Sequence, residues 1–214
     1  MSEISTQILE NYEIVKKALS SYPKVKLIAV SKKQKLDKVK VLVDAGHKDF
    51  GENYAQEWLD KKDQFPIDLN WHFIGNLQSK KLNGLIKNGI HSIHSLGSLS
   101  SIEKFIKLNE KTKATSFIQI NIAQEHQKAG ITVDELKQLA DQSDLTGING
   151  LMTMPPQGLD EKKLRDHFST LRKLAYNLKL PELSMGMSSD WKIAIEEGAT
   201  HLRLGTTLFG ARDY

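Results

Sequence analysis

The sequence of 214 residues contains no cysteine. Disulfide bonds, zinc–thiolate sites and catalytic thiols are therefore excluded. The sequence also lacks an apolar run approaching the roughly 20 residues that cross a bilayer. Its first ten residues carry acidic side chains instead of the basic and apolar regions of a secretory signal. These absences predict a soluble, cytoplasmic protein with no membrane partner.

Several ligand-binding signatures are absent as well. Neither a Walker A motif nor G-x-G-x-x-G occurs, which weakens nucleotide-binding interpretations. The seven histidines lack metal-ligand spacing such as H-E-x-x-H, so no metal site is predicted. The net charge is +4, but basic and acidic residues are interspersed, as on solvated helix faces. We expect the short lysine clusters at 32–35 and 61–62 to be largely solvated, and we predict no nucleic-acid partner.

What is present is a repeated pattern, in which an amphipathic segment ends in glycine and a short apolar segment follows. Gly46, Gly89 and Gly198 each occupy the position after a predicted helix, where a left-handed residue closes the last turn. Capping-box spacing at 100–103 and 132–135 predicts two helix starts. We expect an amphipathic helix at about 3–20 and strands near residues 25–31, 48–52, 70–75, 90–95, 115–121, 147–153, 182–187 and 201–205.

Strands that alternate with helices predict parallel pairing through right-handed crossovers. Eight such units predict an α/β protein that folds as a closed (β/α)8 TIM barrel with an extra N-terminal helix. An open doubly wound sheet is the alternative. No linker or low-complexity segment interrupts the chain, and residues 155–158 are expected to form a loop. We therefore predict a single domain over residues 1–214.

Two short segments predict a phosphate site. In barrels of this kind, a phosphate is commonly bound by the loops that follow the last two strands. Ser188 follows the seventh expected strand and should cap the next helix, and residues 205–207 begin a helix after the eighth. Gly205 lets the backbone approach a ligand, and amides at a helix start attract a dianion. Helix capping explains either segment alone, but their joint occurrence favours phosphate.

A lysine is predicted at the same mouth. Lys32 follows the apolar run and Ser31, and a desolvated lysine near other cations can supply the neutral amine that attacks an aldehyde. Arg203 points to the same side of its strand as Gly205, because side chains alternate along a strand. It would pair with a carboxylate or donate to a pyridine nitrogen. A reactive lysine beside a phosphate site indicates pyridoxal 5′-phosphate (PLP) as the cofactor.

Other residues near strand ends give weaker signals. Asn53 is expected at the mouth after the second strand, and His72 and Asn76 after the third. Methionines on the late strands are expected to pack the barrel, and Met187 would also touch a cofactor ring. No Ser-His-Asp or paired-carboxylate set is found, so no catalytic residue is predicted.

Motifs over nearly the whole chain resemble, in the same order, those of the pyridoxal phosphate homeostasis proteins, also called YggS or PROSC. The motifs lie at residues 29–32, 50–57, 71–78, 119–122, 150–153, 184–190 and 203–214. The resemblance implies a barrel like the N-terminal domain of alanine racemase (PLP fold type III), with PLP held as an aldimine on Lys32. The implied cofactor contacts are Lys32, Asn53, Met187, Ser188, Arg203, Gly205 and Thr206.

By this resemblance, Ser188, Gly205 and Thr206 bind the phosphate, and Arg203 contacts the ring nitrogen. The resemblance also places Asn53 and Met187 near the ring. The loop after the reactive lysine, and the loop that carries a lysine at position 128, depart from the usual family sequence. Neither departure touches the implied contacts.

The resemblance also implies a PLP carrier that buffers or delivers the cofactor; a PLP-dependent amino-acid racemase is the alternative. Racemisation needs acid–base groups on both faces of the substrate-derived carbanion. In alanine racemases the second group is a tyrosine from another domain, which we do not expect after Tyr214. Arg203 at the ring nitrogen would also make PLP a poorer electron sink. We expect a non-catalytic monomer that supplies apo PLP-dependent enzymes; a phosphate-sugar or nucleotide barrel without PLP is more distant.

Overall fold

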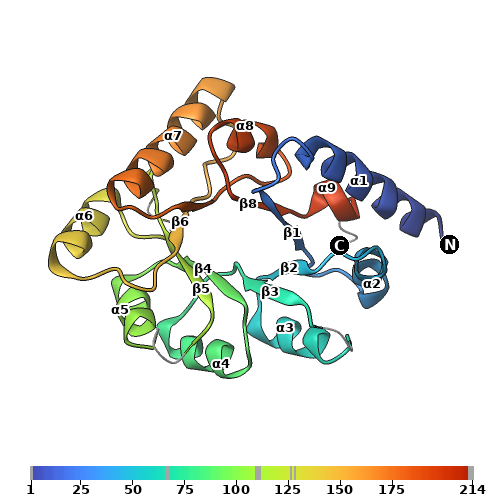
Figure 1. The fold of residues 1–214 in the computed structure, drawn as a ribbon, viewed down its shortest axis with the longest axis horizontal. Coiled ribbons are helices and arrows are strands. Elements are labelled where there is room, and N and C mark those ends of the chain that lie inside the picture. Colours follow the sequence, from blue (N-terminus) through green and yellow to red (C-terminus); the bar gives the residue numbers. More distant parts are fainter. Residues whose placement is uncertain (1, 66–67, 109–111, 126, 128, 212–214) are drawn as a thin grey trace.

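The computed structural model describes residues 2–65, 68–108, 112–125, 127 and 129–211. At its centre, eight parallel strands pair in sequence order, and the last strand closes onto the first (Figure 1). The strands are β1 (Lys26–Val30), β2 (Asp49–Glu52), β3 (Asn70–Phe73), β4 (Ser92–Leu96), β5 (Thr115–Gln119), β6 (Gly150–Met152), β7 (Glu182–Ser184) and β8 (His201–Leu204). The predicted TIM barrel is confirmed, and the open doubly wound alternative is wrong.

Helices connect the strands and surround the ring (Figure 1). They are α1 (Glu3–Leu19), α2 (Leu36–Asp44), α3 (Ala55–Lys62), the 3-10 helix η1 (Ser79–Lys81), α4 (Leu82–Lys87), α5 (Leu99–Leu108), α6 (Val133–Gln142), α7 (Glu161–Asn177), α8 (Trp191–Glu196) and α9 (Thr206–Phe209). The N-terminal helix α1 packs beside α2 and α9. The side chain of Asn11 donates a hydrogen bond to the carbonyl of Leu208 (3.2 Å). This contact ties the first helix to the last one.

The expected strands and the helix expected at about 3–20 are all present. The observed strands are shorter than the expected ones, because the last residues of several apolar runs leave the ladder for the loops of the mouth. The seventh strand, for example, ends at Ser184. Gly46, Gly89 and Gly198 follow helices with φ of 82°, 76° and 94°, which confirms their predicted role as helix stops.

One of the two expected capping boxes is confirmed. Thr132 Oγ1 accepts from the N–H of Glu135 (3.1 Å), and the Glu135 carboxylate accepts from the N–H of Thr132 (2.7 Å). The box expected to begin at Ser100 is wrong, because α5 starts before that residue. Instead, Ser98 Oγ accepts from the N–H of Ser101 (3.3 Å). A run of serines offers several hydroxyls, and the spacing alone selected the wrong one.

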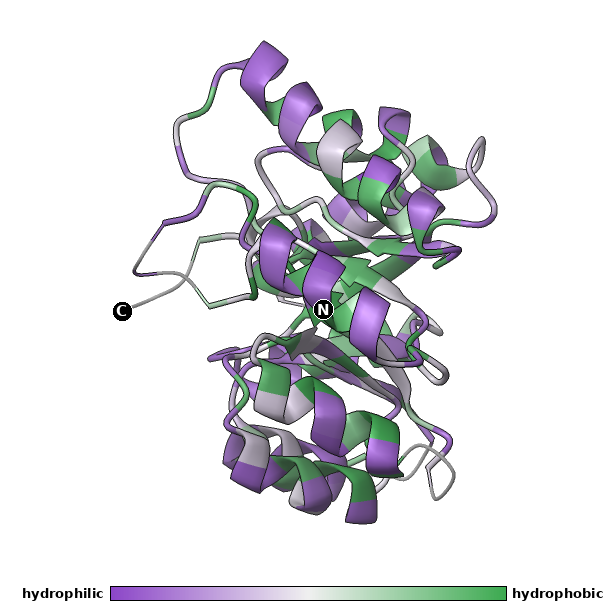
Figure 2. Ribbon diagram, turned by 90° about the vertical axis from the view of Figure 1, so that its left-hand side faces the viewer, coloured by the Kyte–Doolittle hydropathy of each residue, from purple (hydrophilic) through white to green (hydrophobic). Residues whose placement is uncertain are grey.

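Apolar side chains fill the layer between the strands and the helices. Phe50, Trp71 and Phe73 are buried there with the inward faces of the helices. In Figure 2 the central strands are mostly apolar, whereas the helices carry both polar and apolar residues. This layer holds the barrel rigid beneath its mouth. Within the described ranges, no helix has the length and apolar character that crossing a bilayer requires.

Candidate cofactor site

A cavity of about 790 Å³ opens where the strands end. This is the end at which working residues lie in barrels of this type, and the volume is typical of small-molecule sites. All the residues that the sequence predicted as cofactor contacts line it: Lys32, Asn53, Met187, Ser188, Arg203, Gly205 and Thr206. They come from the ends of β1, β2 and β7, from β8, and from the start of α9. The fold therefore gathers in one cavity residues that are far apart in the sequence.

A further part of the cavity lining was missed by sequence reasoning. It includes Ile74 after β3, Met154 after β6, Leu164 of α7, and the loop at 155–159. That loop was expected only as a connection. Apolar side chains after a strand carry no chemical signal, so only the three-dimensional structure assigns them to the cavity. They give the site an apolar face.

Buried charges hold the backbone before Lys32. The ammonium group of Lys61 donates to the carbonyl of Ser31 and to Oε1 of Glu52 (2.6 Å). The same carboxylate oxygen accepts from the hydroxyl of Ser31 (2.7 Å). Burial raises the pKa of Glu52, although the charge of Lys61 opposes that shift. These hydrogen bonds thus fix the backbone at the end of β1, directly before Lys32.

The backbone after Lys32 is held by Glu57, which also pairs with Lys61. Glu57 Oε1 accepts from Lys61 Nζ (2.8 Å) and from the N–H of Lys33, whose φ of 58° is left-handed. The expectation that Lys61 is solvated is therefore wrong, since only 5% of it is exposed. The signal was the spacing of Glu57 and Lys61, which places them one helical turn apart.

Ser188 joins the loops after β7 and β8. The expectation that it caps the helix directly after it is wrong, because α8 begins at Trp191 and has Asp190 as its N-cap. Ser188 Oγ instead accepts from the N–H groups of Gly205 (3.3 Å) and Thr207 (3.1 Å), at the start of α9. A hydroxyl that accepts in this way keeps its own proton for a ligand oxygen. The two loops thus form one corner that suits an anion.

Arg203 is buried and held in place by two hydrogen bonds. Nη1 donates to the hydroxyl of Ser184 (2.6 Å), and Nη2 donates to the carbonyl of Thr153 (2.9 Å). Burial lowers the pKa of Arg203 to about 10, while the charge of Asp190 opposes this shift. The guanidinium is therefore a cation at neutral pH. It presents a rigidly positioned donor group to the cavity that it lines.

Asn53 shows that the cavity fits a polar ligand. Its Oδ1 is buried and has no hydrogen-bond partner among the described residues. A Cβ atom at Gly75 would lie 1.9 Å from the backbone oxygen of Asn53, so only glycine lets the next loop pass this close. A buried acceptor without a partner is costly, and a ligand that donates a hydrogen bond would remove that cost. Met187 also lines the cavity, and its N–H donates to Asp190 Oδ1 (2.6 Å).

A line of hydrogen bonds runs from Arg203 through the interior of the barrel. Ser184 Oγ lies 2.7 Å from His94 Nδ1, His94 Nε2 lies 3.0 Å from His72 Nδ1, and His72 Nε2 lies 3.1 Å from Asp49 Oδ1. β4 and β7 are not neighbours in the ring, so the contact between Ser184 and His94 crosses the lumen. Because a carboxylate only accepts, neutral imidazoles would all donate towards Asp49. The line connects the cavity with the opposite end of the barrel.

One of the weaker predictions for the mouth is wrong, and the other residue, Asn76, does not line the cavity. His72 lies inside the barrel, because it precedes the end of β3 and its ring turns into the lumen. Asn76 is exposed. Burial lowers the pKa of His72 to about 4 and that of His201 to about 3, so both rings are neutral at pH 7. Position 128 lies outside the described residues.

The chain is similar to known proteins over most of its length. The family described as "Alanine racemase, N-terminal domain" matches residues 5–213. The chain is 38% identical over 201 residues to the pyridoxal phosphate homeostasis protein of Aquifex aeolicus, covering 88% of each chain. It is 39% identical over 203 residues to that of Pseudomonas aeruginosa, covering 89% of this chain and 86% of the relative.

Solved structures give the same result. PipY of Synechococcus elongatus PCC7942, with PLP bound, has a TM-score of 0.84 and 34% identity, over 95% of this chain and 100% of PipY. Alanine racemase from Bartonella henselae has a TM-score of 0.76 at 17% identity, over 98% of this chain and 64% of the racemase. The racemase thus shares the fold alone. On these grounds the chain belongs to the pyridoxal phosphate homeostasis proteins and carries the alanine racemase N-terminal domain over nearly its whole length.

Proposed function

We propose that this protein binds PLP in the cavity at the barrel mouth and serves to buffer and deliver the cofactor in the cytoplasm. The main support is the convergence in one cavity of every contact residue that the sequence predicted. The names of the relatives and the PLP in PipY agree with this proposal. In this proposal the recipients are apo PLP-dependent enzymes, and the carrier acts as a single-domain monomer.

The proposed roles follow from the chemistry of the lining residues. The hydroxyls of Ser188 and Thr206, with the backbone at Gly205, would hold the phosphate at the start of α9. Amides at a helix start favour a dianion, and glycine allows its close approach. Arg203 would donate to the ring nitrogen, and the side-chain amide of Asn53 would lie beside the ring. Bound PLP supplies an aldehyde, to which Lys32 Nζ would be linked covalently as an aldimine.

The same arrangement supports binding without turnover. Among the described residues that line the cavity, the ionisable side chains are those of Lys32, Asp190 and Arg203. Asp190 Oδ1 already accepts from the N–H of Met187 (2.6 Å). A cationic Arg203 would keep the ring nitrogen unprotonated and so weaken its electron-withdrawing effect. No side chain is thereby identified that could act as an acid opposite Lys32.

The absorption spectrum tests the binding. Protein incubated with PLP should absorb near ~420 nm, and borohydride should remove the band and leave a mass increment on Lys32. Lys32→Ala should abolish the band and keep the far-UV circular dichroism of the parent. Peptide mapping that places the label on Lys33 or Lys35 would contradict the assignment.

Deuterium exchange tests the carrier function. Purified, PLP-loaded protein should incorporate little deuterium at Cα of a panel of L-amino acids in deuterated water, and it should transfer PLP to an apo-enzyme. Exchange at roughly 1–1000 per second, the usual range of enzymes, would establish turnover instead.

A further inference from the structure

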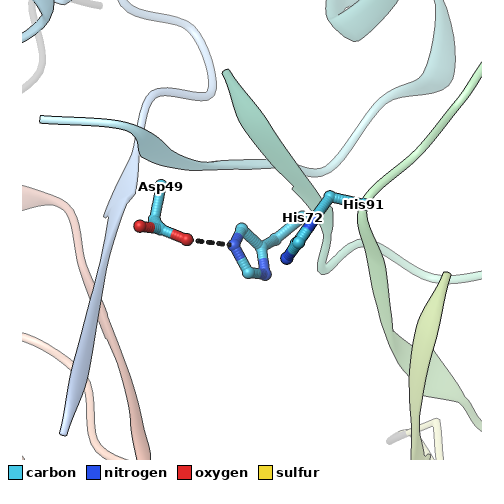
Figure 3. Close-up of side chains that lie close together, drawn as sticks. All are labelled: Asp49, His72 and His91. Atoms are coloured by element: carbon cyan, nitrogen blue, oxygen red, sulfur yellow. Dashed lines mark hydrogen bonds and ion pairs between the residues drawn. The ribbon is translucent and has the colours of Figure 1, made fainter. Parts of the chain in front are cut away.

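Three side chains with metal-binding atoms meet at the amino-terminal end of the barrel (Figure 3). Asp49 begins β2, His72 lies in β3, and His91 immediately precedes β4. Their potential ligand atoms all lie within 4.8 Å of one another. β2 begins with Asp49 here and leads to Asn53 in the cavity, so this cluster lies at the opposite end of the barrel from the PLP site.

We propose that Asp49, His72 and His91 bind one divalent transition-metal ion, with zinc as the preferred ion. Two imidazole nitrogens and one carboxylate oxygen are donors that zinc takes in sites with three protein ligands and one open position. Hard cations such as magnesium prefer sites made of oxygen atoms alone. The ligands come from three successive strands, which is why spacing within the sequence gave no metal signal.

The distances suit such an ion. Donor atoms around a tetrahedral zinc lie about 3.3 Å apart when each bond is about 2.0–2.1 Å long. Asp49 Oδ1 and His72 Nε2 are already 3.1 Å apart. The atom contributed by His91 has to move by at most about 1.5 Å to complete the set, as the same bond lengths require.

The surroundings separate a metal site from an ordinary Asp–His hydrogen bond. His91 is half-buried, and no hydrogen bond to its ring is found among the described residues. Its ring instead lies edge-on to that of His72, with centroids 5.3 Å apart. The other two ligands each have a further contact: Asn70 donates to Asp49 Oδ1 (3.2 Å), the oxygen beside His72, and His72 Nδ1 lies 3.0 Å from His94 Nε2. Outer contacts of this kind orient the ligands of metal sites.

One nearby charge opposes a cation. The ammonium group of Lys26 acts electrostatically on Asp49, His72 and His91. It acts on Glu182 as well, whose carboxylate is at the same end of the barrel. The carboxylates of Asp49 and Glu182 and the ammonium of Lys26 together sum to one formal negative charge. Lys26 thus reduces the affinity for a cation without reversing the sign of the local charge.

Titration of the full chain without PLP tests the proposal, since free PLP would itself compete for zinc. In competition with a chromophoric chelator, we expect one Zn²⁺ per chain, with a Kd of roughly 1 μM or below. Co²⁺ in the same site should give the intense visible absorption of tetrahedral coordination. An excess of Mg²⁺ should displace neither ion.

Substitutions link the binding to these residues. Loss of an outer-shell partner typically costs ten- to a hundredfold in affinity, so His91→Ala and Asp49→Asn should each weaken Zn²⁺ binding by more than about a hundredfold. His201→Met replaces an interior histidine outside the cluster and serves as the control. It should change the Zn²⁺ affinity by less than about twofold. Lys26→Met should raise the affinity by roughly two- to tenfold.

Either of two results would overturn the proposal. One is the absence of a saturable Zn²⁺ site below about 100 μM. The other is binding that His91→Ala and Asp49→Asn leave unchanged, which would place the zinc elsewhere on the chain. Circular dichroism of each variant verifies its fold. A His91→Ala chain that still takes up PLP separates this test from that of the proposed function.

Discussion

Lys61 and Lys62 are adjacent in α3 but have opposite surroundings. The side chain of Lys61 is buried, and it contacts Glu52 and Glu57 at 2.6 and 2.8 Å. Lys62 donates to the carbonyl of Asn88 near the surface. Lys61 holds the carbonyl of Ser31, and its partner Glu57 holds the N–H of Lys33. Lys61 therefore acts on the cavity without lining it.

Replacing Lys61 by methionine should destabilise the protein strongly. The change leaves Glu52 buried without a counter-ion, and removal of one partner from a buried ion pair costs about 3–5 kcal/mol. Lys62→Met, the matched control, should cost no more than about 1 kcal/mol. Urea unfolding at pH 7 measures both values. Equal losses of unfolding free energy in the two variants would show that the buried contacts of Lys61 add no stability beyond that of a surface lysine.

Thr206→Ala should weaken the binding of PLP but not that of pyridoxal. Loss of one hydrogen bond to a charged group costs roughly 1.5–3 kcal/mol, or about one to two decades in affinity. Ser188→Ala should show the same selectivity, with an added loss of stability from the unsatisfied amides of α9. Equilibrium titration with both ligands provides the comparison. Losses of equal size for PLP and pyridoxal would rule out a phosphate contact.

Among single residues, the sequence predicts those that are chemically reactive or charged and that also lie close to the end of a strand. Lys32 and Arg203 have both properties, and the structure places each of them in the cavity. The support beneath them was not predictable, since Glu52 and Lys61 meet Ser31 only through the fold. Spacing in the sequence also could not show that Ser188 caps a helix beyond the next strand.

Among the elements, the loop between β7 and α8 combines a left-handed glycine with close neighbours. Gly186 has a φ of 92°, and a Cβ atom there would lie 2.7 Å from Cβ of Ala194 and from Cδ2 of Leu202. Gly158, in the loop after β6, also has a positive φ of 77°, but its surroundings are open. Comparing Gly186 with Gly158 therefore separates the free-energy cost of backbone strain from the cost of steric overlap.

Gly186→Ala should therefore cost more stability than Gly158→Ala. Both changes carry the backbone penalty of a non-glycine residue with positive φ, about 1–2 kcal/mol. Gly186→Ala adds overpacking of typically 1–3 kcal/mol. The shift in urea midpoint, with m-values compared, gives the difference. A Gly158→Ala protein that is as unstable as the Gly186→Ala protein would refute the steric explanation.

The elements themselves were predictable, because each glycine stop and apolar run is a local feature. Their ends were less so. Several predicted strands extend into the loops of the mouth, where Ile74, Met187 and Gly205 line the cavity. Apolar residues at these strand ends therefore do not indicate further strand pairing.

For the molecule as a whole, the unusual feature is a polar barrel interior. Branched aliphatic side chains commonly fill this space, but here the buried residues include His72, His94, Ser184 and Arg203. His201 lies beside them, with its ring 5.6 Å from that of His94. Closing the barrel thus removes several titratable groups from water.

The fold should consequently lose stability in mild acid. Burial lowers the pKa of His201 to about 3, whereas an unfolded histidine titrates near 6.5. Below pH 6.5 the unfolded chain binds the proton and the folded chain does not, so stability falls as the pH decreases towards 3. At pH 5 one such group costs about 2 kcal/mol relative to pH 7.5.

Urea unfolding at pH 7.5 and pH 5 measures this dependence, and His201→Met should reduce it. His94, whose pKa burial also lowers, should retain part of the effect in that variant. A stability that is identical at the two pH values, or a variant with an unchanged pH dependence, would contradict the prediction.

The line of hydrogen bonds through the barrel has one more consequence. A cation on Nε2 of His72 would replace the proton that this atom gives to Asp49, so Nδ1 would carry the proton instead. Donors and acceptors would then exchange roles through His94 as far as Ser184, the partner of Arg203. Binding of zinc at one end of the barrel and of PLP at the other would then be thermodynamically linked. The factor by which zinc changes the affinity for PLP must equal the factor by which PLP changes the affinity for zinc.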